Sequence, residues 1–161
     1  MDLDRLVLAY LYAKGSSTLD DIAKGLGVDK AELARTLSSL ESSYLVRAQK
    51  KGLVFKKLVY SLTPKGLEEG SKAYTELNER AQKVNELAQS GSDLSSLGLI
   101  PAEVMLMNLL GLLSVETIAA LSLIGLMQAT EAVEEVAEQT PEEESETDAL
   151  DYDGDFDLDD Q

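Results

Sequence analysis

The chain has 161 residues and a formal net charge of −16, and it contains neither cysteine nor histidine. Disulfides, thiolate nucleophiles, imidazole acid–base groups and zinc sites of the usual ligand types are therefore excluded. The length suits one domain of ordinary size or a small domain with appendages. We expect a cytoplasmic binding protein without cofactor or metal rather than an enzyme.

The charge is distributed unevenly along the chain. All 14 lysines and arginines lie between Arg5 and Lys83, whereas residues 91–161 carry 18 of the 30 acidic residues and no base. The front of the chain is therefore mildly basic and the back strongly acidic. The low pI of the whole molecule does not argue against nucleic-acid binding by the front half.

The first elements are short helices. Apolar residues at helical spacing predict a helix from about Leu3, which Gly15 ends. Thr18 and Asp29 each stand three positions before an acidic residue, which is the pattern of a helix N-cap. Between them "KGLGV" supplies a glycine turn of the length that joins two short crossed helices.

The period then changes. Residues 44–66, "YLVRAQKKGLVFKKLVYSLTPKG", are rich in β-branched and aromatic residues and centred on Gly52, which predicts a β-hairpin. Pro64 stops the second strand and suits the first turn of a following helix.

The order of helix, "LDDIAKGLGVDKAELARTLSSLE", hairpin and "YSLTPKG" into a long helix resembles the winged helix-turn-helix domain of MarR- or PadR-like regulators. The resemblance covers roughly residues 3–90. It implies a mainly α fold with a small β-hairpin wing, and double-stranded DNA as a partner. In such domains the second helix of the pair enters the major groove and the wing lies along the backbone.

The outward face of that second helix has few bases. Opposite the inward leucines at 33, 37 and 40, the candidate DNA contacts are Lys30, Arg35, Ser38, Ser39 and Ser42. An arginine reads guanine and serines hold phosphates. Glu32 and Glu41 lie close by, so the alternative is a solvated helix face in a winged helix that binds protein.

The predicted wing has more positive charge. Four lysines, Lys50, Lys51, Lys56 and Lys57, surround its turn and are candidate phosphate contacts. The alternative is that lysines on an edge strand only block aggregation. Residues 53–55 between them are apolar, and we expect them to pack under the wing or to meet a partner.

The helix after Pro64 has apolar residues spaced alternately three and four apart. We interpret five of them as the seam of a homodimeric coiled coil: Leu67, Tyr74, Leu77, Ala81 and Val84. The alternative is that the seam packs on the chain's own first helix. Two i,i+4 ion pairs are expected on the outer face, Glu76–Arg80 and Glu79–Lys83.

The predicted organisation is a winged-helix domain (1–66), a heptad-patterned helix (67–90), a linker (91–100), an apolar helical segment (101–139) and a disordered acidic tail (140–161). We expect the apolar segment to form two helices, about 101–113 and 115–139. Asn108 and Glu116 in its middle disfavour a membrane span. A buried hairpin that serves dimerisation or docking on another protein is the preferred interpretation.

The acidic tail ends in "LDYDGDFDLDD". Its glycine is too early, and its closing glutamate missing, for a calcium loop. Tyr152, Phe156 and Leu158 alternate with aspartates and are candidate interaction residues, with a plain solvated tail as the alternative; the chain's own wing lysines are among the partners considered. The sequence thus favours a dimeric winged-helix transcription regulator. The alternative is a non-catalytic accessory subunit of a replication or transcription complex, which uses the winged helix, apolar helices and tail to bind protein.

Overall fold

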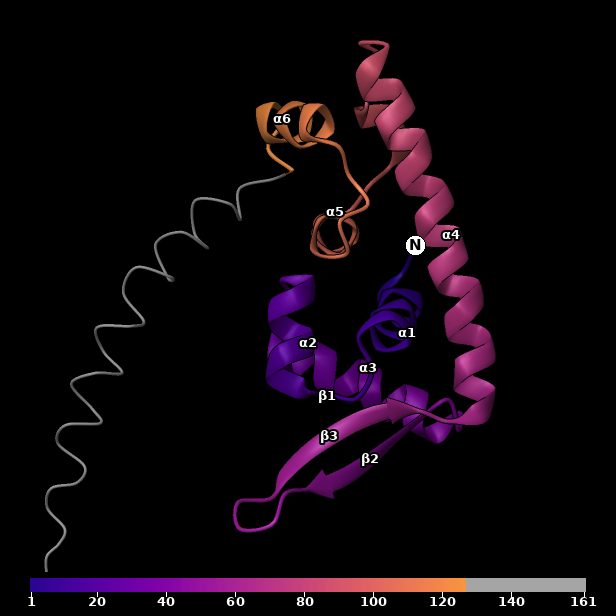
Figure 1. Ribbon diagram of the computed structural model, residues 1–161, viewed down its shortest axis with the longest axis vertical. Coiled ribbons are helices and arrows are strands. Elements are labelled where there is room, and N and C mark those ends of the chain that lie inside the picture. Colours follow the sequence, from indigo (N-terminus) through magenta and orange to yellow (C-terminus); the bar gives the residue numbers. More distant parts are fainter. Residues whose placement is uncertain (127–161) are drawn as a thin grey trace, which may run out of the picture. The chain divides into compact units, whose positions relative to one another are not determined.

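This computed structural model describes residues 1–126; the end of the last predicted helix and the predicted tail lie outside the described residues. The elements, in chain order, are α1 (Leu3–Lys14), β1 (Ser17–Thr18), α2 (Leu19–Leu26), α3 (Lys30–Ser42), β2 (Val46–Lys51), β3 (Lys57–Leu62), α4 (Pro64–Gln89), the 3₁₀ turn η1 (Ser95–Leu97), α5 (Pro101–Leu109) and α6 (Val115–Leu123) (Figure 1).

The first seven elements have the order and pairing of a winged helix. Helices α2 and α3 form the helix-turn-helix, and β2 and β3 form an antiparallel hairpin that projects below the helices as the wing (Figure 1). The short strand β1 pairs with β3, so the sheet order is β1-β3-β2 and β2 is an edge strand. The winged-helix fold predicted for the front half is confirmed. Strand β1 was not predicted, because two residues are too few to show a strand pattern in the sequence.

Both predicted N-caps form. The Thr18 hydroxyl accepts a hydrogen bond from the Asp21 backbone N–H at 3.1 Å and starts α2. The Asp29 carboxylate accepts from two backbone N–H groups of the first turn of α3. Gly27 ends α2 with φ of 65°, a left-handed conformation that favours glycine. These caps fix the angle at which α3 leaves the turn.

The "LTPKG" segment locks the base of the wing to α4. The Thr63 hydroxyl donates to the Tyr44 carbonyl at 2.7 Å and accepts from the Gly66 N–H at 2.9 Å, which caps α4. Pro64 occupies the first turn, as predicted. Tyr44 itself has φ of 63° at the end of α3, where glycine is the usual residue. The end of α3 at Tyr44 and the start of α4 at Thr63 are thus joined at the base of the wing.

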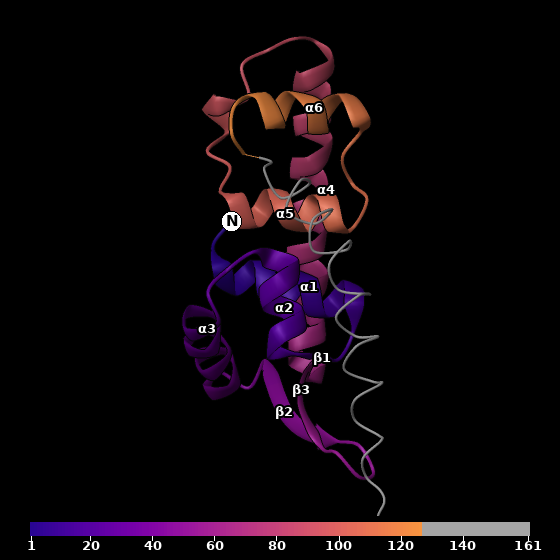
Figure 2. The same cartoon turned by 90° about the vertical axis from the view of Figure 1, so that its left-hand side faces the viewer.

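The long helix α4 is shared between two packing layers. Helix α1 lies against its first half, and α5 and α6 lie against its second half (Figures 1 and 2). Leu77, Ala81 and Val84 are at most 1% exposed and belong to the chain's own two hydrophobic clusters. The predicted dimer seam is therefore wrong at these three positions, because their side chains already have partners within one chain. Leu67 is half-exposed, and Tyr74 packs on Tyr12 with ring centroids 5.7 Å apart.

The predicted linker and apolar hairpin form one layer on α4. Leu94 is buried in the second cluster, so residues 91–100 are not a free linker. The Asn85 side chain on α4 donates to the Leu112 carbonyl and accepts from the Ser114 N–H and the Thr117 hydroxyl. This amide fixes the turn between α5 and α6, and Ser114 caps α6 as predicted. In residues 1–126 both helices are shorter than expected.

Not all apolar residues of this layer are covered by the described residues. Val115 and Leu123 on α6 are largely exposed. None of the helices within residues 1–126 is both long and apolar enough to span a bilayer.

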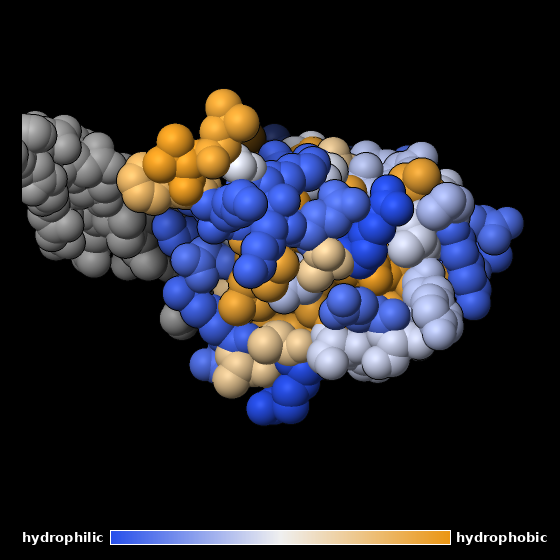
Figure 3. Space-filling model, turned by 90° about the horizontal axis from the view of Figure 1, so that it is seen from below, coloured by the Kyte–Doolittle hydropathy of each residue, from blue (hydrophilic) through white to orange (hydrophobic). Residues whose placement is uncertain are grey.

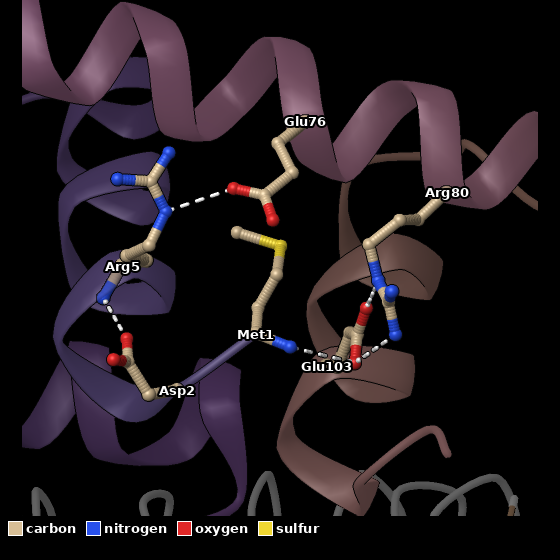
Figure 4. A network of polar contacts seen from close by, with 6 residues as sticks. All are labelled: Met1, Asp2, Arg5, Glu76, Arg80 and Glu103. Atoms are coloured by element: carbon tan, nitrogen blue, oxygen red, sulfur yellow. Dashed lines mark hydrogen bonds and ion pairs between the residues drawn. The ribbon is translucent and has the colours of Figure 1, made fainter. Parts of the chain in front are cut away.

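Within residues 1–126 two ion pairs join α4 to its neighbours (Figure 4), and neither of the two predicted i,i+4 pairs forms. Glu76 accepts from Arg5 of α1 at 2.8 Å. Arg80 instead binds both oxygens of Glu103 on α5, whose side chain is fully buried, and the Met1 ammonium lies 3.6 Å from the same carboxylate. The hydrogen bonds that the Arg80 guanidinium donates to the Glu103 carboxylate raise the pKa of Arg80 above its ordinary value. Glu76 and Arg80, which were predicted to pair with each other, each pair instead with a residue farther away in the sequence.

Candidate nucleic-acid interface

Helix α3 presents the side chains that the sequence assigned to its outer face. The leucines at 33, 37 and 40 are buried beneath it, and Arg35, Ser38, Ser39 and Ser42 are exposed. Arg35 has no ion-pair partner among the described residues. One guanidinium and three hydroxyls are enough to contact phosphates and one base edge, but not to read an extended sequence.

Lys30 of α3 forms an ion pair with a residue of α2. Its ammonium lies 3.0 Å from the carboxylate of Asp20 at the start of α2, and both side chains are well exposed. Asp20 also lines an open groove between α2 and the first residues of β3, together with Asp21, Lys24 and Lys57. The groove is therefore mixed in charge. A phosphate placed there meets two carboxylates as well as two ammonium groups, so the groove is a poor phosphate site.

The wing lysines form the densest positive cluster in the described part of the chain. In the register of the hairpin, Lys51 stands directly across from Lys57, and Lys50 across from Leu58. Lys56 precedes them in the turn, and all four lysines are exposed. No ion pair involving any of them is formed by residues 1–126. Like charges directly opposite on a sheet repel, so this pair lowers stability unless an anion lies between them.

The tip of the wing is apolar and bare. Leu53, Val54 and Phe55 are 98%, 81% and 85% exposed, so they do not pack under the wing, and the other expectation, that they meet a partner, stays a prediction. Figure 3, which views the wing end, shows a projecting hydrophobic group bordered by hydrophilic residues. Gly52 sets this turn: its φ is 125°, and a Cβ there would stand 2.3 Å from the Phe55 carbonyl oxygen. The turn drives the three side chains outward.

Two solved structures resemble this fold. One is the disulfide-formed AbfR, with 24% identity over 56% of this chain and 68% of that chain and a TM-score of 0.43. The other is a mutant of Lactococcus lactis ZitR, with 20% identity over 60% of this chain and 66% of that chain and a TM-score of 0.47. No protein-family model and no curated protein matches the chain. At these values the likenesses carry no argument about function, which has to come from the residues of the wing and α3.

Two features of this surface lay beyond the sequence pattern. The cross-strand position of Lys51 and Lys57 depends on a hairpin register that composition does not give. The ion pair of Lys30 with Asp20 depends on how α2 and α3 cross. The only available signal was the symmetry of the two lysine pairs about Gly52, which hints at a register but does not establish it.

Proposed function

We propose that the chain is a non-catalytic winged-helix DNA-binding protein, a dimeric transcription regulator of the MarR/PadR-like kind. The observation that supports this most is the pairing of Lys51 with Lys57 across the wing, flanked by Lys50 and Lys56, without an acidic partner in residues 1–126. A polyanion relieves this repulsion, and duplex DNA offers phosphates at a regular spacing along which a hairpin lies.

The two parts of the interface contribute differently. The wing supplies phosphate contacts, which give salt-dependent affinity and carry no sequence information. Helix α3 supplies Arg35 for a base or phosphate contact, and Ser38, Ser39 and Ser42 for phosphates. We therefore expect affinity to come mainly from the wing, with modest discrimination between sequences.

A homodimer is part of this proposal, but its contact is placed on α6 and not on the predicted seam of α4. Since Leu77, Ala81 and Val84 are buried within one chain, the exposed apolar side chains Val115 and Leu123 of α6 are better placed to meet a second copy. Two-fold symmetry would present two α3 helices to two half-sites. Light scattering on the full chain measures this directly: a monomer at micromolar concentrations removes the dimer from the proposal.

An accessory-subunit function has one specific observation in its favour. Three exposed apolar side chains at the wing tip are unusual for a surface whose only ligand is a phosphate backbone. They suit an apolar protein surface, so a protein partner at the wing is the second candidate.

The experiment is a salt series of duplex binding by the full chain, with the wing lysines removed in pairs. We expect each variant, Lys50→Ala/Lys51→Ala and Lys56→Ala/Lys57→Ala, to lower the slope of log affinity against log salt by about 1.8 because two phosphate contacts are lost. The matched control is Lys72→Ala/Lys83→Ala, which removes the same charge from the exposed face of α4. Fluorescence anisotropy with a labelled duplex between about 50 and 200 mM salt gives these slopes. Equal slopes for control and wing variants exclude the wing contact, and no salt-dependent binding by the parent excludes the function.

A further inference from the structure

We propose that the wing tip is a docking surface for the acidic, aromatic segment 150–160 of the same chain. The surface consists of Leu53, Val54 and Phe55 together with the four flanking lysines, and is called the wing-tip surface below. The segment is "LDYDGDFDLDD". The wing-tip surface and the segment match in two ways: both carry apolar side chains, and their charges are opposite.

The wing-tip surface needs an occupant with two kinds of group. Its three apolar side chains are more than four-fifths exposed and project from the turn that Gly52 begins. Lys50 and Lys51 on β2 and Lys57 on β3 flank them, and Lys56 lies in the turn itself. An occupant that offered only carboxylates or phosphates would leave the apolar group in water. One that offered only apolar surface would leave Lys51 and Lys57 repelling each other across the hairpin.

The segment offers both kinds of group at the spacing of an extended chain. Tyr152, Phe156 and Leu158 alternate with aspartates from Asp151 to Asp159. In an extended chain successive side chains point to opposite sides, so the apolar side chains of the segment share one face and its aspartates share the other. The outer edge of β2 is open within the described sheet, because the strand order is β1-β3-β2. An extended peptide can therefore lie along the wing without displacing a strand.

Charge favours this partner within the chain. All basic residues lie at or before Lys83, and every charged residue after it is acidic. Within the described residues the wing lysines are the densest basic cluster and have no acidic partner. Attraction between a peptide of one sign and a surface of the other selects register and partner.

The connecting chain is long enough for contact within one molecule. Residues 127–149 separate the last described residue from the segment and span up to roughly 80 Å when extended. Asn85 holds the start of α6 near the last turns of α4, and the wing precedes the first turn of α4. Helix α4 is about 39 Å long and the wing adds about 20 Å. The reach exceeds this path, so the contact needs no second copy.

Docking has a consequence that rests on the proposed function. If duplex DNA uses Lys50, Lys51, Lys56 and Lys57, the aspartates of the segment compete for the same ammonium groups. The segment then lowers DNA affinity, and more so at low salt, where both contacts are strongest.

The test uses a spin label in the full chain without DNA. Because the chain has no cysteine, Gln161→Cys creates one labelling site beside the segment. We expect the nitroxide to broaden the amide resonances of residues 52–57 in an ¹⁵N-labelled chain. Replacing Tyr152, Phe156 and Leu158 with serine keeps every charge and is expected to remove most of that broadening. The control Val133→Ser/Val136→Ser changes apolar residues outside the segment and is expected to leave the broadening of residues 52–57 unchanged.

Each outcome decides the proposal. Absence of wing broadening overturns it, and so does broadening that persists in the serine variant. A mixture of spin-labelled chains without ¹⁵N and ¹⁵N chains without the spin label distinguishes a second copy: wing broadening in that mixture comes from another molecule and overturns docking within one chain. Because no DNA is present, a failed DNA-binding experiment leaves this result unaffected, and a failed docking leaves the DNA slopes unaffected.

Discussion

Replacing Glu103 with alanine is expected to lower the free energy of unfolding by about 3–5 kcal/mol, the usual cost of removing one partner of a buried ion pair. The Glu103 side chain is fully buried, and it accepts hydrogen bonds from the Nε and Nη2 groups of Arg80 while facing the Met1 ammonium. Its loss leaves a guanidinium and an ammonium facing an empty apolar space between α1, α4 and α5. Urea unfolding monitored by circular dichroism measures the change.

The matched control is the other ion pair on α4. Glu76 and Arg5 are both about one-third or more exposed, so water screens them, and Glu76→Ala is expected to cost about 0–1 kcal/mol. Glu103→Gln is the conservative variant: it keeps the shape and an acceptor for Arg80, and we expect an intermediate loss of about 1–2 kcal/mol. Equal effects of Glu103→Ala and Glu76→Ala would contradict the buried network.

Replacing Gly66 with alanine is expected to destabilise the chain by about 3 kcal/mol, at the upper end of the usual range for overpacking. Helix propensity alone predicts the opposite sign, since alanine is favoured over glycine in a helix by about 1 kcal/mol. A Cβ at residue 66 would stand 1.9 Å from the Leu45 carbonyl oxygen. Backbone cannot swing aside as a flexible side chain does, so α4 has to move away from the base of the wing.

The neighbouring residue provides the control for Gly66. Lys65 lies in the same helical turn and is exposed, so Lys65→Ala is expected to change the free energy of unfolding by less than about 0.5 kcal/mol. Thermal and urea unfolding of both variants compare the two positions. A Gly66→Ala variant as stable as the parent would show that the wing and α4 do not meet as closely as the structure has it.

Much of the winged helix was predictable because its signals are local. The caps at Thr18 and Asp29, the turn at Gly27 and the proline that opens α4 each act within a few residues. The strand pattern on either side of Gly52 likewise fixes a hairpin. Such signals are read from sequence because the interaction and the residues that make it lie in the same short stretch.

The partners of α4 were not predictable in the same way. A heptad pattern shows that Leu77, Ala81 and Val84 form one apolar face, but it does not say which surface covers that face. Glu103 indicated a helix start, whereas its partner Arg80 lies 23 positions earlier on another helix. Asn85 gave no signal at all, since an amide on a polar helix face is ordinary until its partners are known. These contacts depend on tertiary packing.

The candidate interface divides along the same line. Composition located the wing lysines and the exposed face of α3. It did not show that Lys51 and Lys57 oppose each other, nor that residues 53–55 are bare. Both depend on the hairpin register and the backbone at Gly52. These two facts turn a lysine-rich hairpin into a surface that needs both negative charge and apolar contact.

One measurement tests most directly that the wing is the surface shared by DNA and the acidic segment: a titration of the full chain, spin-labelled at Gln161→Cys, with duplex DNA. Before DNA is added, the label is expected to broaden the amide resonances of residues 52–57. As duplex is added at low salt, those resonances are predicted to shift and to regain intensity, because phosphates replace aspartates at the lysines. Wing resonances that neither shift nor recover at saturating duplex would contradict a shared surface.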